Sequence, residues 1–239
     1  MNKDSAASTT PIRVAILDDH QSTLDGYAYR LDTYKNIEVV ATARFANQLD
    51  KMLQKHAVDL LLLDVSVPIA EDDPNPFPLL HKLPQLRADY PQTAILIVSM
   101  HKHRTLVRAV MEAGAKGYIV KDDRQAIVQL GEIITSIAAG GIFLSDQSYA
   151  AMADANVSDG IKALTPRQVQ ALSLCAAAPD ISTTELARQM NIAASTARNM
   201  LSDIYMRLNV RNRASAIFKA RQLGLITPYS PDPDTSDSA

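Results

Sequence analysis

Five short runs of apolar residues recur along the first half of the chain. The clearest is Leu60–Leu63, four consecutive leucines between Asp59 and Asp64. A strand that shows no alternation of apolar and polar residues is buried on both sides, as in a parallel sheet covered by helices. The strands that the five runs predict are Ile12–Leu17, Ile37–Ala43, Asp59–Asp64, Thr93–Val98 and Gly117–Val120.

Segments with apolar residues at helical spacing separate these strands. In the first of them, Leu24, Tyr27, Ala28 and Leu31 lie on one face of a helix. Strands that alternate with helices predict an α/β fold, a doubly wound five-stranded parallel sheet with right-handed crossovers. The predicted helices are Gln21–Thr33, Asn47–Lys55, one that starts near Leu79, Thr105–Ala113 and Asp123–Ala139.

Polar side chains stand where four of the strands end. Asp18 and Asp19 follow the first strand, Asp64 ends the third, and Ser99 and Lys121 follow the fourth and fifth. In open parallel sheets, ligands bind outside the carboxyl ends of the strands. Carboxylates that crowd one edge repel each other unless a cation neutralises them, and such oxygen ligands suit Mg²⁺. The set indicates phosphoryl transfer, although Asp64 taken alone is equally compatible with a helix cap.

The acid pair after the first strand, Asp64 with Pro68 four residues later, Ser99 and Lys121 together resemble the receiver domain of bacterial response regulators. The resemblance covers roughly residues 11–140 and implies a flavodoxin-like fold in which a sensor histidine kinase phosphorylates Asp64. It also implies Mg²⁺ as the cofactor. The implied metal ligands are Asp18, Asp19, Asp64 and the carbonyl of Ser66, and the implied phosphoryl-contacting and switch residues are Ser99, Lys121, Tyr118 and His101.

The loop after Asp64 departs from this family. Residues 69–78 contain three acids and three prolines, lack glycine, and are about four residues longer than the usual connection. Prolines stiffen the segment and exclude a helix before Leu79. We favour a tolerated surface insertion, and the alternative is a feature that selects the partner kinase.

The second half predicts four helices. Thr165 and Pro166 suit the start of the first, and Ser182 with Glu185 suits a capping box at the second. The third runs through Leu208 and the fourth covers about 213–223. Two short helices joined by a tight turn indicate a helix-turn-helix unit.

Three stretches of this half resemble the LuxR-type DNA-binding domain: Leu164-Thr-Pro-Arg, Glu185-Leu-Ala, and Ser195 through Arg213. With the receiver, this is the layout of the NarL/FixJ response regulators. It implies a promoter-binding transcription regulator that forms a homodimer on activation. The residues expected to contact DNA are Thr196, Arg198, Asn199, Ser202, Arg207, Arg211 and Arg213. The start of the recognition helix departs from the family, with Arg198 in place of the usual lysine and Met200 in place of histidine.

Charge divides the chain in the same way. Residues 1–150 hold 15 Lys and Arg against 18 Asp and Glu, a net charge of −3, whereas residues 161–227 hold 9 against 3, a net charge of +6. A basic half suits phosphate contacts, so nucleic-acid binding is favoured over a four-helix protein-interaction module. The expected domains are 11–140, a linker at 141–160, the helix-turn-helix domain at 161–227, and a disordered acidic tail at 228–239.

The composition narrows the remaining possibilities. Cys175 is the single cysteine, so no disulfide framework exists. No apolar stretch approaches a membrane span, and the N-terminus lacks a signal-peptide core, so we expect a cytoplasmic protein without a membrane partner. The chain is not expected to be an enzyme. Two alternatives stay open, a DNA-binding regulator that does not use phosphorylation and, less favoured, an aspartyl-phosphate phosphohydrolase. Such phosphohydrolases carry Asp-x-Asp at the nucleophile, whereas Asp64 is followed by Val65 and Ser66.

Overall fold

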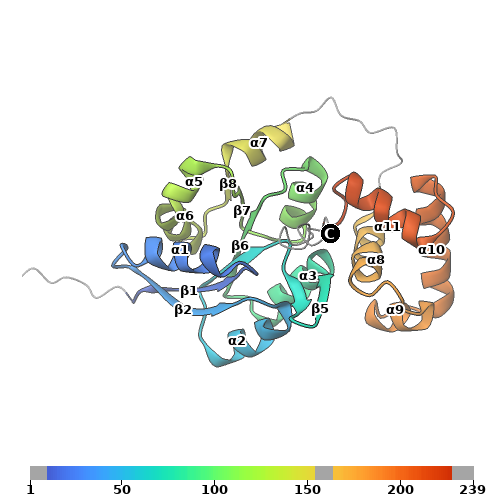
Figure 1. Ribbon diagram of the computed structural model, residues 1–239, viewed down its shortest axis with the longest axis horizontal. Helices are drawn as coiled ribbons and strands as arrows, with labels where there is room; N and C mark the ends of the chain where they lie inside the picture. The colour runs from blue at the N-terminus through green and yellow to red at the C-terminus, as the bar shows by residue number, and fades with distance from the viewer. Residues whose placement is uncertain (1–9, 154–163, 228–239) are drawn as a thin grey trace, which may run out of the picture.

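The structure is a computed structural model that describes residues 10–153 and 164–227 (Figure 1). Its first half is a parallel sheet with helices on both faces. The strand order is β2-β1-β3-β6-β7-β8. The strands are β1 (Ile12–Leu17), β2 (Ile37–Ala43), β3 (Leu60–Asp64), β6 (Ala94–Ser99), β7 (Gly117–Val120) and β8 (Phe143–Leu144).

The leucine run of β3 supplies both faces of this sheet. Leu61 and Leu63 pack into one apolar cluster, and Leu60 and Leu62 pack into the other. All four side chains are buried, because helices cover the sheet on each side. The covering helices are α1 (Gln21–Leu31), α2 (Leu49–Lys55), α3 (Leu79–Asp89), α4 (Arg104–Glu112), α5 (Arg124–Val128) and α6 (Leu130–Ala138).

The predicted doubly wound parallel sheet is confirmed, with three differences in detail. The sheet has six strands and not five, since the two-residue β8 pairs with β7. The prediction of a single helix over Asp123–Ala139 is wrong in one respect. The segment forms two helices, α5 and α6, which divide at Gln129 because its φ of −88° and ψ of 14° leave the helical range. The helix α7 (Asp146–Ala153) packs on α4 and β7, so the first part of the expected linker is folded.

The long loop after Asp64 has a structure of its own. It forms an antiparallel hairpin of β4 (Pro68–Ala70) and β5 (Asp73–Pro76), separate from the main sheet. Pro68 pairs with Pro76, and the side chain of Asp73 accepts hydrogen bonds from the backbone and the amide of Asn75. The 3₁₀ turn η1 (Ala46–Gln48) lies against β4.

The second half is helical. Its elements are α8 (Pro166–Ala177), α9 (Thr183–Gln189), α10 (Ala194–Leu208) and α11 (Arg213–Gln222). A full capping box forms at Thr165, whose hydroxyl accepts from the Gln168 N–H while the Gln168 amide oxygen accepts from the Thr165 N–H. Ser182 caps α9 as expected, but the Glu185 carboxylate pairs with Arg188, so the reciprocal bond of a capping box is not made there.

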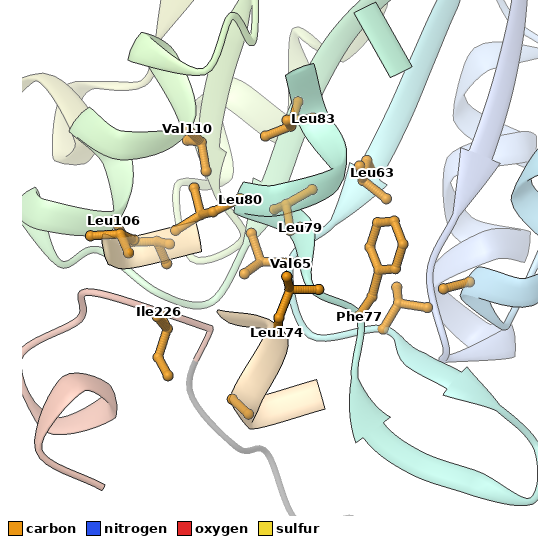
Figure 2. Close-up of a cluster of buried hydrophobic side chains, with 14 of the residues drawn as sticks. Leu63, Val65, Phe77, Leu79, Leu80, Leu83, Leu106, Val110, Leu174 and Ile226 are labelled. Atoms are coloured by element: carbon orange, nitrogen blue, oxygen red, sulfur yellow. The ribbon is translucent and has the colours of Figure 1, made fainter. Parts of the chain in front are cut away.

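The two halves are in contact (Figure 1). Helix α8 packs against α3 and β5, and one apolar cluster contains buried residues of both halves (Figure 2). Cys175 is buried in that cluster. Among the described residues, no helix is both long enough and apolar enough to cross a membrane.

Candidate functional site

The strand order brings the predicted acidic site together. Strands β1, β3, β6 and β7 are consecutive neighbours in the sheet, so the residues at their carboxyl ends share one edge. Asp18, Asp64 and Ser99 are buried there, with 1%, 5% and 0% of their surfaces exposed. Buried polar groups need hydrogen-bonding or charged partners. The two buried carboxylates have one cation as their common partner.

Lys121 is that cation. Its Nζ lies 2.7 Å from Asp18 Oδ2 and 2.8 Å from Asp64 Oδ2. Burial raises the pKa of Asp18, the charge of Asp64 raises it further, and Lys121 opposes both effects. Burial alone would lower the pKa of Lys121, but the two carboxylates outweigh it and the pKa is raised. Lys121 is therefore held charged, and two carboxylates share its single positive charge.

Asp19 stands at the rim of this site. Its carboxylate is 27% exposed and lies 2.8 Å from Nδ1 of His20, while the backbone N–H of His20 donates to Asp18 Oδ1 at 3.0 Å. The carboxylates of Asp18 and Asp19 and the His20 ring offer three ligand atoms within 4.8 Å of one another. Arg44 also reaches this rim, where its Nε donates to the Asp19 carbonyl. Sequence reasoning missed His20 and Arg44; the position of His20 directly after the acid pair was the available signal.

These donors fit a hard divalent cation. The buried carboxylates of Asp18 and Asp64 share Lys121, and the partly exposed carboxylate of Asp19 lies beside that of Asp18; oxygen ligands of this kind suit Mg²⁺. Asp64 is 5% exposed at the end of β3, and the backbone N–H of Ser66 donates to its Oδ1 at 3.3 Å. The backbone of Ser66 is thus at the same edge, next to the expected phosphoacceptor.

Three further predicted residues, Ser99, His101 and Tyr118, are joined by hydrogen bonds beside Asp64. Ser99 Oγ accepts from the His101 backbone N–H at 3.1 Å, and the Tyr118 hydroxyl donates to the His101 carbonyl. The ring of His101 reaches back, with Nε2 3.1 Å from Ser66 Oγ. Tyr118 is fully buried, and burial raises the pKa of its phenol. His101 is half-buried and connects the Asp64 loop with the Ser99 loop.

The predicted DNA-contact residues occupy two settings. Thr196, Arg198, Asn199 and Ser202 are exposed on α10, and Ser202, which is three residues after Asn199 and four after Arg198, lies on the same face as both. The opposite face of the helix packs into the core through Ala197, Leu201, Ile204 and Leu208.

The other three arginines differ in their partners. Arg207 forms an ion pair with Asp203 at 2.8 Å, and Arg211 is exposed after the left-handed Asn209 that ends α10. Arg213 donates to the carbonyls of Ile181 and Pro179 in the loop before α9. Arg213 thus supports the helix-turn-helix fold directly, which its place in the sequence did not reveal.

Comparison with known proteins gives the same division of the chain. Residues 14–131 match the response regulator receiver domain, and residues 162–220 match the luxR family of bacterial regulatory proteins. The two matches together span about three quarters of the chain. The chain is a response regulator. It has a receiver domain and a LuxR-type DNA-binding domain, and the family consists of DNA-binding transcription regulators.

Relatives of this response regulator share the whole layout. It is 28% identical to the transcriptional regulatory protein MctR of Rhizobium johnstonii, over 90% of this chain and 96% of the relative. It is 22% identical to the transcriptional regulatory protein DegU of Brevibacillus brevis, over 90% and 95%. Among solved structures, it resembles RcsB of Salmonella enterica serovar Typhimurium bound to the rprA promoter, with a TM-score of 0.56 and 21% identity over 88% of this chain and 98% of that chain.

Proposed function

We propose that this response regulator is switched by transfer of a phosphoryl group from a sensor histidine kinase to Asp64. The observation that carries the proposal is the contact of Lys121 with both Asp64 and Asp18 at the ends of neighbouring strands. This arrangement holds the nucleophile at a ligand-binding edge and keeps a cation ready for the charge that arrives.

The chain's own residues suit each part of this transfer. An Asp64 carboxylate oxygen attacks phosphorus, the phosphorus–nitrogen bond of the phosphohistidine breaks, and the imidazole leaves with the bonding electron pair. Lys121 then moves from carboxylate to phosphoryl oxygen, and the hydroxyl of Ser99 donates to a second phosphoryl oxygen. Asp18, Asp19, Asp64 and the Ser66 carbonyl would hold Mg²⁺, which supplies positive charge to the phosphoryl oxygens.

The outputs and partners follow from the second half. We assign sequence readout in double-stranded DNA to Thr196, Arg198, Asn199 and Ser202 on the exposed face of α10, and phosphate contacts to Arg207, Arg211 and Arg213. A homodimer on activation is part of the proposal, supported by a solved structure of two RcsB dimers bound to two parallel DNAs. With a histidine kinase and a promoter as partners, the site of action is the cytoplasm. The proposal includes no catalysis on an external substrate.

The domain limits belong to the same proposal. We place the receiver at 11–140 and the DNA-binding domain at 161–227, in line with the family matches at 14–131 and 162–220. The acidic tail expected at 228–239 and the part of the expected linker after Ala153 lie outside the described residues.

Intact-mass measurement after incubation with acetyl phosphate and Mg²⁺ tests the acceptor. The wild-type chain should gain one phosphoryl group, and Asp64→Asn should gain none. A matched control is Asp59→Asn, because Asp59 lies at the other end of the same strand, bound to Arg13. Phosphorylation retained by Asp64→Asn contradicts the assignment.

A further inference from the structure

His20 lies against both carboxylates of the acid pair. Its Nδ1 is 2.8 Å from Asp19 Oδ1 and 3.7 Å from Asp18 Oδ1. Within residues 10–153 and 164–227, these three side chains are the one group of three acidic, histidine or cysteine residues whose ligand atoms all lie within 4.8 Å of one another. The acidic edge of the sheet therefore offers a ring nitrogen in addition to carboxylate oxygens.

The backbone holds this arrangement in place. Asp18 follows the last residue of β1, and His20 stands at the N-cap of α1 with an extended backbone, φ −92° and ψ 114°. The His20 N–H donates to Asp18 Oδ1 at 3.0 Å, and the His20 carbonyl accepts from the N–H of Leu24 in the first turn of α1. The ring is thus attached between a strand end and a helix start, which limits how far it can move from the carboxylates.

The buried carboxylate of Asp18 has a different neighbour on each oxygen. Its Oδ2 lies 2.7 Å from Nζ of Lys121, whereas its Oδ1 faces His20. Asp19 is bound in a similar way, since Arg44 donates to its backbone carbonyl and its carboxylate contacts the His20 ring. A cation on the His20 side of the two carboxylates therefore does not have to displace Lys121.

The spacing and the donor types suit a transition ion. Two ligand atoms of one divalent cation, each bound at about 2.1 Å, are at most about 4.2 Å apart. Both distances from Nδ1 of His20 lie within that limit. Mg²⁺ prefers oxygen ligands, whereas an imidazole nitrogen binds first-row transition ions such as Co²⁺, Ni²⁺ and Zn²⁺ more strongly. An added ring nitrogen therefore raises the affinity for these ions much more than the affinity for Mg²⁺.

The ring can present a lone pair at Nδ1. In the metal-free protein Nδ1 carries the proton of this contact, because the ionised carboxylate of Asp19 only accepts hydrogen bonds. The His20 side chain is 51% exposed, so its ring can exchange this proton with water. When the proton is on Nε2 instead, the ring is still neutral and Nδ1 is free to bind a cation.

We propose that His20 is a ligand of the divalent cation, beside Asp18 and Asp19, and that it shifts the preference of the site from Mg²⁺ toward a divalent first-row transition ion. The inference rests on the function proposed above, because it concerns the cation that assists phosphoryl transfer to Asp64. It adds one nitrogen ligand to the oxygen ligands already assigned. His20 thereby determines which cation the receiver holds when both kinds are present.

The test compares the binding of Co²⁺ and Mg²⁺ to the full chain, prepared without a polyhistidine tag. Co²⁺ is followed by its visible absorption, which changes when a nitrogen ligand replaces an oxygen ligand, and Mg²⁺ by titration calorimetry. His20→Asn should weaken Co²⁺ binding by at least about 10-fold, since the loss of even an outer partner of a metal ligand typically costs that much. Its affinity for Mg²⁺ should stay that of the wild type.

His103→Asn is the matched control. His103 is also exposed, and it stands at the N-cap of α4 with an extended backbone and a carbonyl that accepts from the N–H of Val107. Within the described part of the chain, its ring belongs to no group of three close ligand atoms. His103→Asn should therefore keep the affinities for both ions and the absorption of bound Co²⁺.

The outcomes separate this inference from the proposed function. If His20→Asn is folded by circular dichroism and matches the wild type in Co²⁺ affinity and absorption, His20 is not a ligand, and only this inference is overturned. A wild-type chain that binds Co²⁺ no more tightly than Mg²⁺ overturns the preference in the same way. If the wild type binds neither ion, the acidic site holds no divalent cation, and the cofactor of the proposed function is contradicted as well.

Discussion

The ammonium of Lys121 lies 2.8 Å from the carboxylate of Asp64, although the two residues are 57 positions apart in the sequence. Both side chains are largely shielded from water, with 15% and 5% of their surfaces exposed. The pair brings together the ends of β3 and β7, two strands that are separated by β6.

Replacing Lys121 with methionine leaves Asp18 and Asp64 buried without their cation. Breaking a buried ion pair from one side typically costs about 3–5 kcal/mol, so Lys121→Met should lower the free energy of unfolding by a similar amount at neutral pH. The cost should shrink as the pH falls through the raised pKa of Asp18, because the protonated acid no longer needs a partner. Urea unfolding at several pH values measures it, with exposed Lys102→Met as the control. An equal loss in both variants would contradict the role of the pair.

Replacing Asp18 with asparagine should stabilise the metal-free protein at neutral pH. The pKa of Asp18 is raised in the native state, so its proton is favourable at low pH and its ionisation costs stability as the pH rises through that value. Asparagine removes this cost, and Lys121 keeps Asp64 as its partner. The gain should disappear toward acid pH, and Mg²⁺ should no longer raise the melting temperature. Melting curves with and without Mg²⁺ measure both effects.

His81 predicts a second pH dependence. It is 7% exposed on α3, and burial, Lys82 and Arg167 of α8 lower its pKa to about 4. The native state therefore binds this proton less readily than the unfolded state, whose histidine titrates near its ordinary value. Stability should fall as the pH drops from about 6.5 to about 4, by up to about 3 kcal/mol at about 1.4 kcal/mol per pH unit.

His81→Gln should remove this part of the acid sensitivity, since glutamine has no charged form. Exposed His103→Gln is the control and should keep it. Urea unfolding between pH 4 and pH 7 is the measurement. Identical slopes for His81→Gln and the wild type would show that the proton binds elsewhere.

Two arginines of the DNA-binding domain should have different roles, one in reading the base sequence and one in binding phosphate. Arg198 is exposed in the first turns of α10, where helix-turn-helix proteins contact bases. Arg198→Ala should cost about 1–3 kcal/mol on a selected site and much less on a scrambled one, so it shrinks the ratio of affinities. Arg211→Ala should weaken both sites alike and lower the salt slope by about one. Binding to both sites across a salt series decides between these roles.

Much of this architecture could be predicted because strands and caps have local signatures. The run Leu60–Leu63 has no polar face and does form the central strand, and Thr165 and Pro166 do begin α8. The five carboxyl-end residues were predictable for a similar reason, since each ends a strand or lies within two residues of its end. Asp18 and Asp64 meet at Lys121 only because of the order of the strands in the sheet. The resemblance to receiver domains implied that order, and no single motif could.

Other features depend on tertiary packing and were missed. The hairpin in 69–78 was expected to be a surface insertion, because prolines and acids give no strand pattern. Strands β4 and β5 pair because Val67 and Phe77 are buried in the apolar cluster that also contains residues of α8. The hydrogen bonds that Arg213 donates to the carbonyls of Ile181 and Pro179 could not be predicted from its position in the sequence alone.

The most direct test of Asp64 as the phosphoacceptor is the mass of the full chain after reaction with acetyl phosphate and Mg²⁺, followed by peptide mapping. We expect a single added phosphoryl group on the peptide that contains Asp64, no addition in Asp64→Asn, and full addition in Asp59→Asn. A phosphoryl group on any other residue, or none on the folded wild-type chain, would show that Asp64 is not the acceptor.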